Sequence, residues 1–146
     1  MLAEQATSHG SAVAKLELNH RTINSASHST GMEWLTLLFA AVTVWGLCGS
    51  VMGLGRYFWS TETAIAIHLP AAPIFAFVAA TIHATMFPEF AQLTRAVVII
   101  GVVIVLDFAI VAPLLERSFE MFRSVIGTWM PFGLIFLAAW IAGLLF

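Results

Sequence analysis

Charged residues are scarce in this chain. Lys, Arg, Asp and Glu make up 10% of its 146 residues, against roughly a quarter in soluble domains, and the mean hydropathy is +0.95. No run of Lys or Arg occurs and the formal net charge is -2, so the basic surface needed for nucleic-acid binding is missing. Cys48 is the one cysteine, which excludes a disulfide or a CxxC redox pair within one copy. This composition indicates an integral membrane protein.

Long apolar stretches are what the sequence has in abundance. Four of them approach the ~20 residues that a helix needs to cross ~30 Å of hydrocarbon. They cover residues 34–54, 64–87, 93–115 and 125–146. Because the links between them are short, neighbouring helices must run antiparallel. The predicted fold class is an all-α integral membrane protein, an antiparallel up-down four-transmembrane-helix bundle. Its build is typical of small multi-pass proteins of the bacterial inner membrane.

The first 31 residues have a different composition. They are rich in Ser, Ala, Thr, His and Asn and contain no apolar segment of the signal-peptide kind. We predict a disordered polar tail over residues 1–31, followed by a transmembrane domain over residues 32–146. Two translation starts stay open, Met1 and Met32, because Met32 immediately precedes the first apolar stretch.

Asp107 is the residue most out of keeping with its surroundings. It is the one charged side chain in Ala96–Leu115. An aspartate at the bilayer centre costs roughly 2.5–3.5 kcal/mol for insertion, while each Leu, Ile, Val or Phe returns about 0.3–0.6 kcal/mol. Fifteen such apolar residues between Leu93 and Leu115 offset the aspartate, so the helix still inserts. Buried ionisable groups in membranes usually have a polar partner or a wet cavity, which makes Asp107 the first candidate for function.

Folding the four helices back on one another sets the depth of the other polar side chains. Asp107 then lies level with the proline-containing part of the second span, and His68 lies ~7.5 Å farther toward the same surface. Thr128 in the fourth span, Ser50 in the first and Arg117 in the third loop fall toward the same end. The other half of the bundle is almost purely apolar, with His83 and Arg95 at its rim.

This asymmetry predicts a polar half-pocket around Asp107. Its candidate ligand-binding or proton-binding residues are Asp107, His68, Thr128, Ser50 and Arg117. A carboxyl group held between a low-dielectric interior and a neighbouring cation can exchange a proton near neutral pH. Proton-linked transport and small-ligand binding both suit such a site. The competing interpretation is that Asp107 only joins helices through a hydrogen bond, a contact averaging about 0.6 kcal/mol in membranes.

Small residues mark the faces where helices can approach closely. Gly49 and Gly53 have GxxxG spacing in the first span, and Ala76 and Ala80 belong to an every-fourth-residue alanine series in the second. Such faces pack either within the chain or against a second copy or another membrane protein. The expected partners are therefore the lipid bilayer and a homo-oligomer or membrane-protein partner that docks on these residues, with no nucleic acid.

Cofactor and enzyme functions find little support in the sequence. His68 and His83 share a helix and are ~22 Å apart along it, so they cannot ligate one haem together. We expect no cofactor and no metal, although a haem shared between two chains through paired His68 stays open. Ser, His and Asp form no recognised catalytic motif and HExxH is absent, so we expect no catalytic residues.

In length and span number the chain resembles the small multidrug resistance transporters. That family's pattern has a membrane-embedded glutamate in the first span, whereas Glu33 here lies at the edge of that span and the buried acid is Asp107 in the third. No residue role therefore carries over. The sequence predicts a small multi-pass membrane protein with a polar half-pocket that serves proton-linked transport or ligand binding. The alternative is a non-catalytic accessory or assembly subunit of a larger membrane complex.

Overall fold

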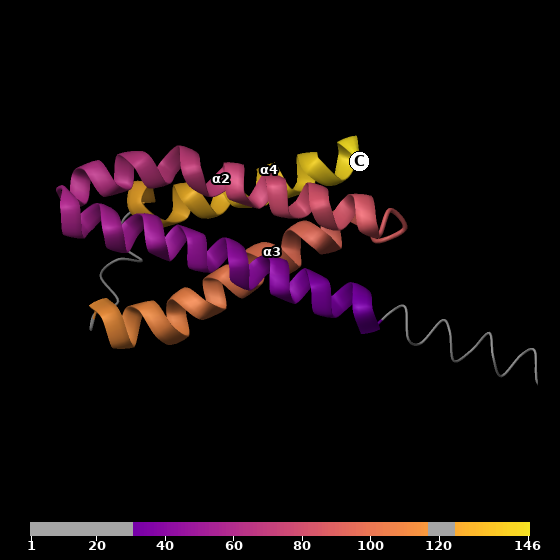
Figure 1. Ribbon diagram of the computed structural model, residues 1–146, viewed down its shortest axis with the longest axis horizontal. Coiled ribbons are helices and arrows are strands. Elements are labelled where there is room, and N and C mark those ends of the chain that lie inside the picture. The colour runs from indigo at the N-terminus through magenta and orange to yellow at the C-terminus, as the bar shows by residue number, and fades with distance from the viewer. Residues whose placement is uncertain (1–30, 117–124) are drawn as a thin grey trace, which may run out of the picture. The chain divides into compact units, whose positions relative to one another are not determined.

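The computed structural model describes residues 31–116 and 125–146, and within these ranges the chain is helical, with no strand (Figure 1). The tail predicted over residues 1–31 falls, except for Gly31, outside this part. The chain divides into two compact units, Met1–Trp34 and Leu35–Phe146, and the packing below is that of the second. Its helical segments are the first helix (Gly31–Phe58), α2 (Thr61–Met86), α3 (Gln92–Leu106) continued by η1 (Asp107–Glu116), and η3 (Val125–Trp129) continued by α4 (Met130–Leu145).

The four predicted spans correspond to these four helical segments. Three helices are long and apolar enough to cross a membrane, Gly31–Phe58, Thr61–Met86 and Gln92–Val111, while Met130–Leu145 is a shorter apolar helix. The largest difference in the second unit is at the end of the first helix, which runs four residues beyond the predicted Leu54. This extension brings Arg56 into the helix instead of into a loop.

Local signals explain where α2 begins and ends. The Ser60 side chain accepts a hydrogen bond from the backbone N–H of Thr63 at 3.2 Å, which satisfies one of the free donors of the first turn. At the other end the backbone N–H of Phe87 still bonds the carbonyl of His83, and Pro88 follows. A short turn then leads into α3, so consecutive helices reverse direction (Figure 1).

The prolines loosen the third and fourth helices more than the second. Pro70 and Pro73 both lie inside α2, which continues as an α-helix through them. In contrast, the chain adopts wide π-helical turns in η1, which contains Pro113, and in η3, which ends just before Pro131. Proline lacks the N–H that an α-helical bond requires, so a change of hydrogen-bond register at these places is expected. Such turns are frequent at functional sites.

Alanines form a buried face of α2. Ala72, Ala76, Ala80 and Ala84 are all buried along one face of α2, which packs against α4. Small side chains let two backbones approach, and van der Waals contact then holds them together. Because Ala76 and Ala80 are buried inside the chain, they offer no surface to a partner.

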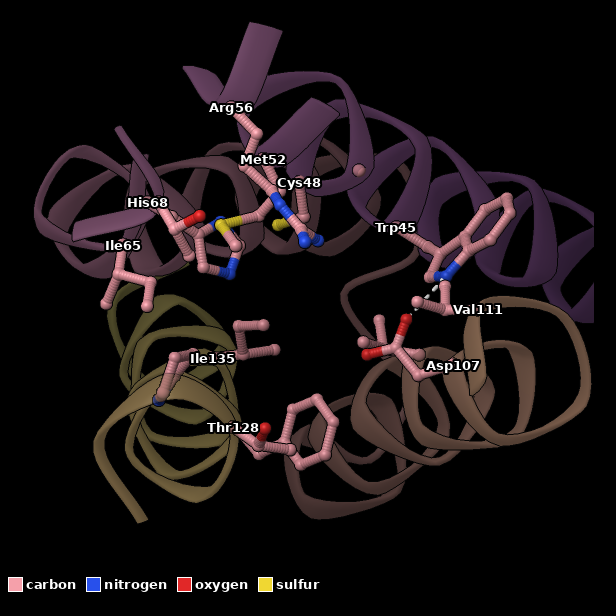
Figure 2. A pocket seen from close by; sticks show the side chains of 15 residues that line it. Trp45, Cys48, Met52, Arg56, Ile65, His68, Asp107, Val111, Thr128 and Ile135 are labelled. Atoms are coloured by element: carbon pink, nitrogen blue, oxygen red, sulfur yellow. Dashed lines mark hydrogen bonds between the residues drawn. The ribbon is translucent and has the colours of Figure 1, made fainter. Parts of the chain in front are cut away.

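The helices surround a central space instead of meeting in the middle. α4 packs on both α2 and α3, whereas α2 and α3 make few contacts with each other. The first helix lies against α2 where Gly55 faces Ala64, and against η1 where Trp45 meets Asp107. Figure 2 shows the first helix and α4 at opposite corners of the cavity, with α2 and the third helix at the other two.

Candidate functional site

A cavity of about 250 Å³ lies between the helices (Figure 2). Every helical segment contributes residues to its wall. Its polar, sulfur-containing and aromatic lining residues are Trp45, Cys48, Met52, Arg56, Thr61, His68, Asp107, Thr128 and Phe132. The rest of the lining is Gly49, Ile65, Val103, Val111, Pro131 and Ile135. An apolar wall with a few polar groups is the usual make-up of a small-ligand pocket.

Asp107 stands at the junction of α3 and η1. Its Oδ1 accepts a hydrogen bond of 2.8 Å from the Trp45 indole Nε1–H, which ties the first helix to the third. Figure 2 shows the other carboxylate oxygen turned toward the cavity. The carboxylate is half-buried. One carboxylate oxygen thus joins the first helix to the third, and the other faces the cavity.

His68 lies across the cavity from Asp107. It comes from α2, and its ring points into the cavity (Figure 2). Its Nδ1 is buried and has no hydrogen-bond partner in the described part of the chain. A buried polar nitrogen without a partner costs about 1–3 kcal/mol unless water or a ligand satisfies it. The His68 ring therefore lines the cavity and carries a hydrogen-bonding nitrogen that the described residues do not satisfy.

The remaining predicted site residues divide between the cavity and elsewhere. Thr128, in η3, is 4% exposed and lines the cavity. Ser50 does not belong to the lining: it is exposed, and its hydroxyl donates to the Gly46 carbonyl at 2.7 Å on its own helix. Arg117 lies outside the described residues. Among the described residues, the arginine that lines the cavity is Arg56, an exposed residue whose guanidinium points inward (Figure 2).

Sequence reasoning missed most of the first helix's contribution. Trp45, Cys48, Met52 and Arg56 recur at intervals of three and four residues, which places them on one face of a helix. A tryptophan, two sulfur-containing residues and an arginine on one face of an apolar helix are a recognisable pattern. The prediction ended the first span at Leu54 and placed Arg56 in a loop, so it overlooked this face.

A second polar cluster lies at the other end of α2. The guanidinium of Arg95 is 1% exposed, and its Nε donates to His83 Nδ1 at 3.0 Å. Its Nη2 donates to the carbonyls of Phe87 and Phe90, each at 3.1 Å. The sequence put His83 and Arg95 at the rim of the apolar half, whereas the structure buries both and joins them. The cluster closes the turn between α2 and α3.

The cavity lining offers a carboxylate on Asp107, an imidazole on His68 and a guanidinium on Arg56. Within residues 31–116 and 125–146, no group of three or more His, Cys, Asp or Glu side chains is placed to hold a metal ion. Searches with protein-family models, among curated proteins and among solved structures find no match. Function therefore has to be inferred from the cavity and from its side chains.

Proposed function

We propose that this chain is a multi-pass membrane protein, built as an antiparallel up-down bundle of four transmembrane helices. Three helices of membrane-spanning length and composition support the proposal. So does the continuous helical segment Val125–Leu145, since its 21 residues give ~31 Å of helix. Large apolar side chains cover the outer faces, among them Leu35, Phe39, Leu54, Ile74, Ile82, Val105 and Leu144. Water-soluble monomers rarely expose so much apolar surface, whereas lipid covers it without penalty.

We further propose that the cavity binds a small polar ligand and that binding is linked to proton exchange on Asp107. One observation carries this proposal: Asp107 and His68 face the same cavity from two helices that scarcely touch. Intramembrane carboxylates and histidines are typical of ligand and proton pathways. The volume of about 250 Å³ is just below the range of roughly 300–1,000 Å³ for drug-sized ligand pockets, which favours a smaller ligand.

Transport assays on reconstituted vesicles test this function while the ligand is still unidentified. Purified protein is placed in vesicles loaded with a pH-sensitive dye, and pools of small amines, carboxylic acids, zwitterions and sugars are added outside. We expect at least one pool to move protons across vesicles that contain the wild-type chain. Asp107→Asn should reduce this movement at least tenfold, since an amide cannot carry the proton. If no pool moves protons, the transport proposal is wrong.

Glu62→Gln is the matched control for that experiment. Glu62 is an exposed carboxylate in the first turn of α2 and is not part of the cavity lining. The same acid-to-amide change there should leave proton movement within about twofold of the wild-type rate. A comparable loss in both variants would show that the assay responds to charge in general and not to Asp107.

The accessory-subunit function has its own supporting observation. Gly49 and Gly53 are exposed on the first helix, and a Cβ added at either would meet no atom within 4 Å. A smooth face of this kind lets a helix from another membrane protein approach closely. Under this alternative, Gly53→Ile abolishes stoichiometric co-purification of a partner from native membranes, while Asp107→Asn leaves it unchanged. Loss of proton movement in Asp107→Asn, with no stoichiometric partner co-purifying, favours the binding function.

A further inference from the structure

The cavity contains side chains of both charges. Asp107 supplies a carboxylate from the junction of α3 and η1, and Arg56 supplies a guanidinium from the end of the first helix. Both charged groups point inward (Figure 2). A ligand with one charge would be attracted by one of them and repelled by the other. The pair therefore favours a ligand that carries both charges.

The two charged groups lie at different depths. Asp107 is fixed by its bond to Trp45, which precedes Arg56 by eleven residues, or ~16 Å along the helix axis. The side chain of a helical residue leans toward the N-terminus, so the Arg56 guanidinium reaches back in the direction of Trp45. The Trp45 side chain leans the same way, so much of this axial separation remains between the two charged groups. A complementary ligand has its two charges several bonds apart instead of on adjacent carbons.

On this basis we propose that the cavity takes a small ω-amino acid, with its ammonium group at Asp107 and its carboxylate at Arg56. The proposal rests on the binding function above and names its ligand class. Asp107 Oδ1 already accepts the Trp45 N–H, and a carboxylate has further acceptor sites on its second oxygen. A guanidinium has five N–H donors in a fork that fits a carboxylate, so Arg56 can bind the acid end alongside its other contacts.

The apolar wall and the volume fit the middle of such a molecule. Ile65, Val103 and Ile135 line the cavity and can cover a chain of methylene groups. At ~30 Å³ per water molecule, the cavity of about 250 Å³ corresponds to roughly eight waters, which is room for 4-aminobutyrate together with a few water molecules. A zwitterion also brings no net charge into the low-dielectric interior, where an unpaired ion is costly.

Equilibrium binding to the full chain in phospholipid nanodiscs tests the ligand class. Radiolabelled 4-aminobutyrate is the probe, and unlabelled 4-aminobutyrate, butylamine, butyrate and glycine are the competitors. We expect the first to compete at least tenfold better than butylamine or butyrate, since each of these lacks one charge. Glycine should compete more weakly than 4-aminobutyrate, because its two charges are too close together to reach both side chains.

Variants assign each end of the ligand to one residue. Asp107→Asn should weaken 4-aminobutyrate binding at least tenfold and remove residual butylamine binding, while butyrate binding persists. Arg56→Gln should have the opposite selectivity, and Arg56→Lys should retain part of the affinity because it keeps the positive charge. Glu62→Gln, an acid-to-amide change outside the cavity lining, should bind within about twofold of wild type. Circular dichroism and size-exclusion chromatography check that each variant is folded.

The outcomes distinguish failure of the ω-amino acid ligand class from failure of the binding function on which it rests. If butylamine competes as well as 4-aminobutyrate and Arg56→Gln changes nothing, the ligand is a simple cation and the ω-amino acid class is wrong. If 4-aminobutyrate does not bind while another solute pool moves protons in an Asp107-dependent manner, the ligand class is also wrong but the cavity function stands. If neither binding nor proton movement occurs, both proposals fail. The competition series uses only wild-type protein, so it decides the ligand class even if a variant does not fold.

Discussion

Gly143→Ala is the substitution whose effect the structure specifies most closely. A Cβ added at Gly143 in α4 would lie 2.7 Å from Arg95 Nη1 and 2.9 Å and 3.0 Å from the Cβ and Cγ of Gln92. Arg95 cannot easily move aside, because it donates hydrogen bonds to His83 and to the carbonyls of Phe87 and Phe90. The added methyl group therefore separates α4 from the start of α3 or breaks those bonds.

The expected change in the free energy of unfolding follows from two opposing effects. Overpacking a close contact costs typically ~1–3 kcal/mol. Replacing glycine by alanine inside a helix returns up to ~1 kcal/mol, and less here because Gly143 is two residues from the end of α4. The net expectation is a loss of about 1–2 kcal/mol in the free energy of unfolding. Gly133→Ala, on the same helix, is the matched control, since a Cβ there meets nothing within 4 Å.

Reversible unfolding in mixed micelles, with helicity followed by circular dichroism as the SDS fraction rises, measures both variants against wild type. Gly133→Ala should unfold at the wild-type SDS fraction or slightly above it. Gly143→Ala should unfold earlier. Equal stability of the two alanine variants would refute the close approach of Gly143 to Arg95, and with it the packing of α4 described above.

Three further predictions concern the cavity. Trp45→Phe removes the bond to Asp107 and should lower the free energy of unfolding by about 0.6–1.7 kcal/mol in the same micelle titration; an unchanged value would show that the bond contributes nothing. Ser50→Ala should change stability by less than ~0.5 kcal/mol and leave 4-aminobutyrate binding intact, because Ser50 is exposed on its own helix; a loss of binding would place it at the cavity. The Cys48 thiol, 7% exposed, should react with a small maleimide at least tenfold more slowly in the folded protein than in SDS-unfolded chain, and equal rates would contradict its burial.

The helical segments could be predicted because their signal is additive along the chain. Hydropathy summed over a bilayer-length window depends on composition alone and needs no knowledge of packing. The predicted spans therefore overlap the observed helices, with the largest difference at one end of the first helix. The exception at the first helix is instructive. The apolar run ends at Leu54, but the helix continues through Arg56 to Phe58. A helix does not have to end where its apolar residues do. The four added residues include Arg56, which lines the cavity.

The sequence predicts how far along the bundle each candidate residue lies, but not toward which side of its helix the side chain points. Counting residues back from each turn fixes how far along the bundle a side chain lies, and it placed Asp107, His68 and Thr128 at one end. It does not fix rotation about the helix axis. Ser50 is two residues from both Cys48 and Met52, which is roughly 200° around a helix with 3.6 residues per turn. It therefore faces away from the cavity that those two residues line.

The two polar clusters differ in a way that explains why only one of them is a candidate site. Counting back from the turn between α2 and α3 already puts His83 level with Arg95, so their contact was available from the sequence. In that cluster Arg95 Nε and Nη2 have acceptors, and a Cβ at Gly143 would find no room beside the guanidinium. Around Asp107 the opposite holds, because a buried His68 nitrogen lacks a partner next to empty volume. Polar residues alone predict a cluster, whereas unmet hydrogen-bonding capacity together with space predicts binding.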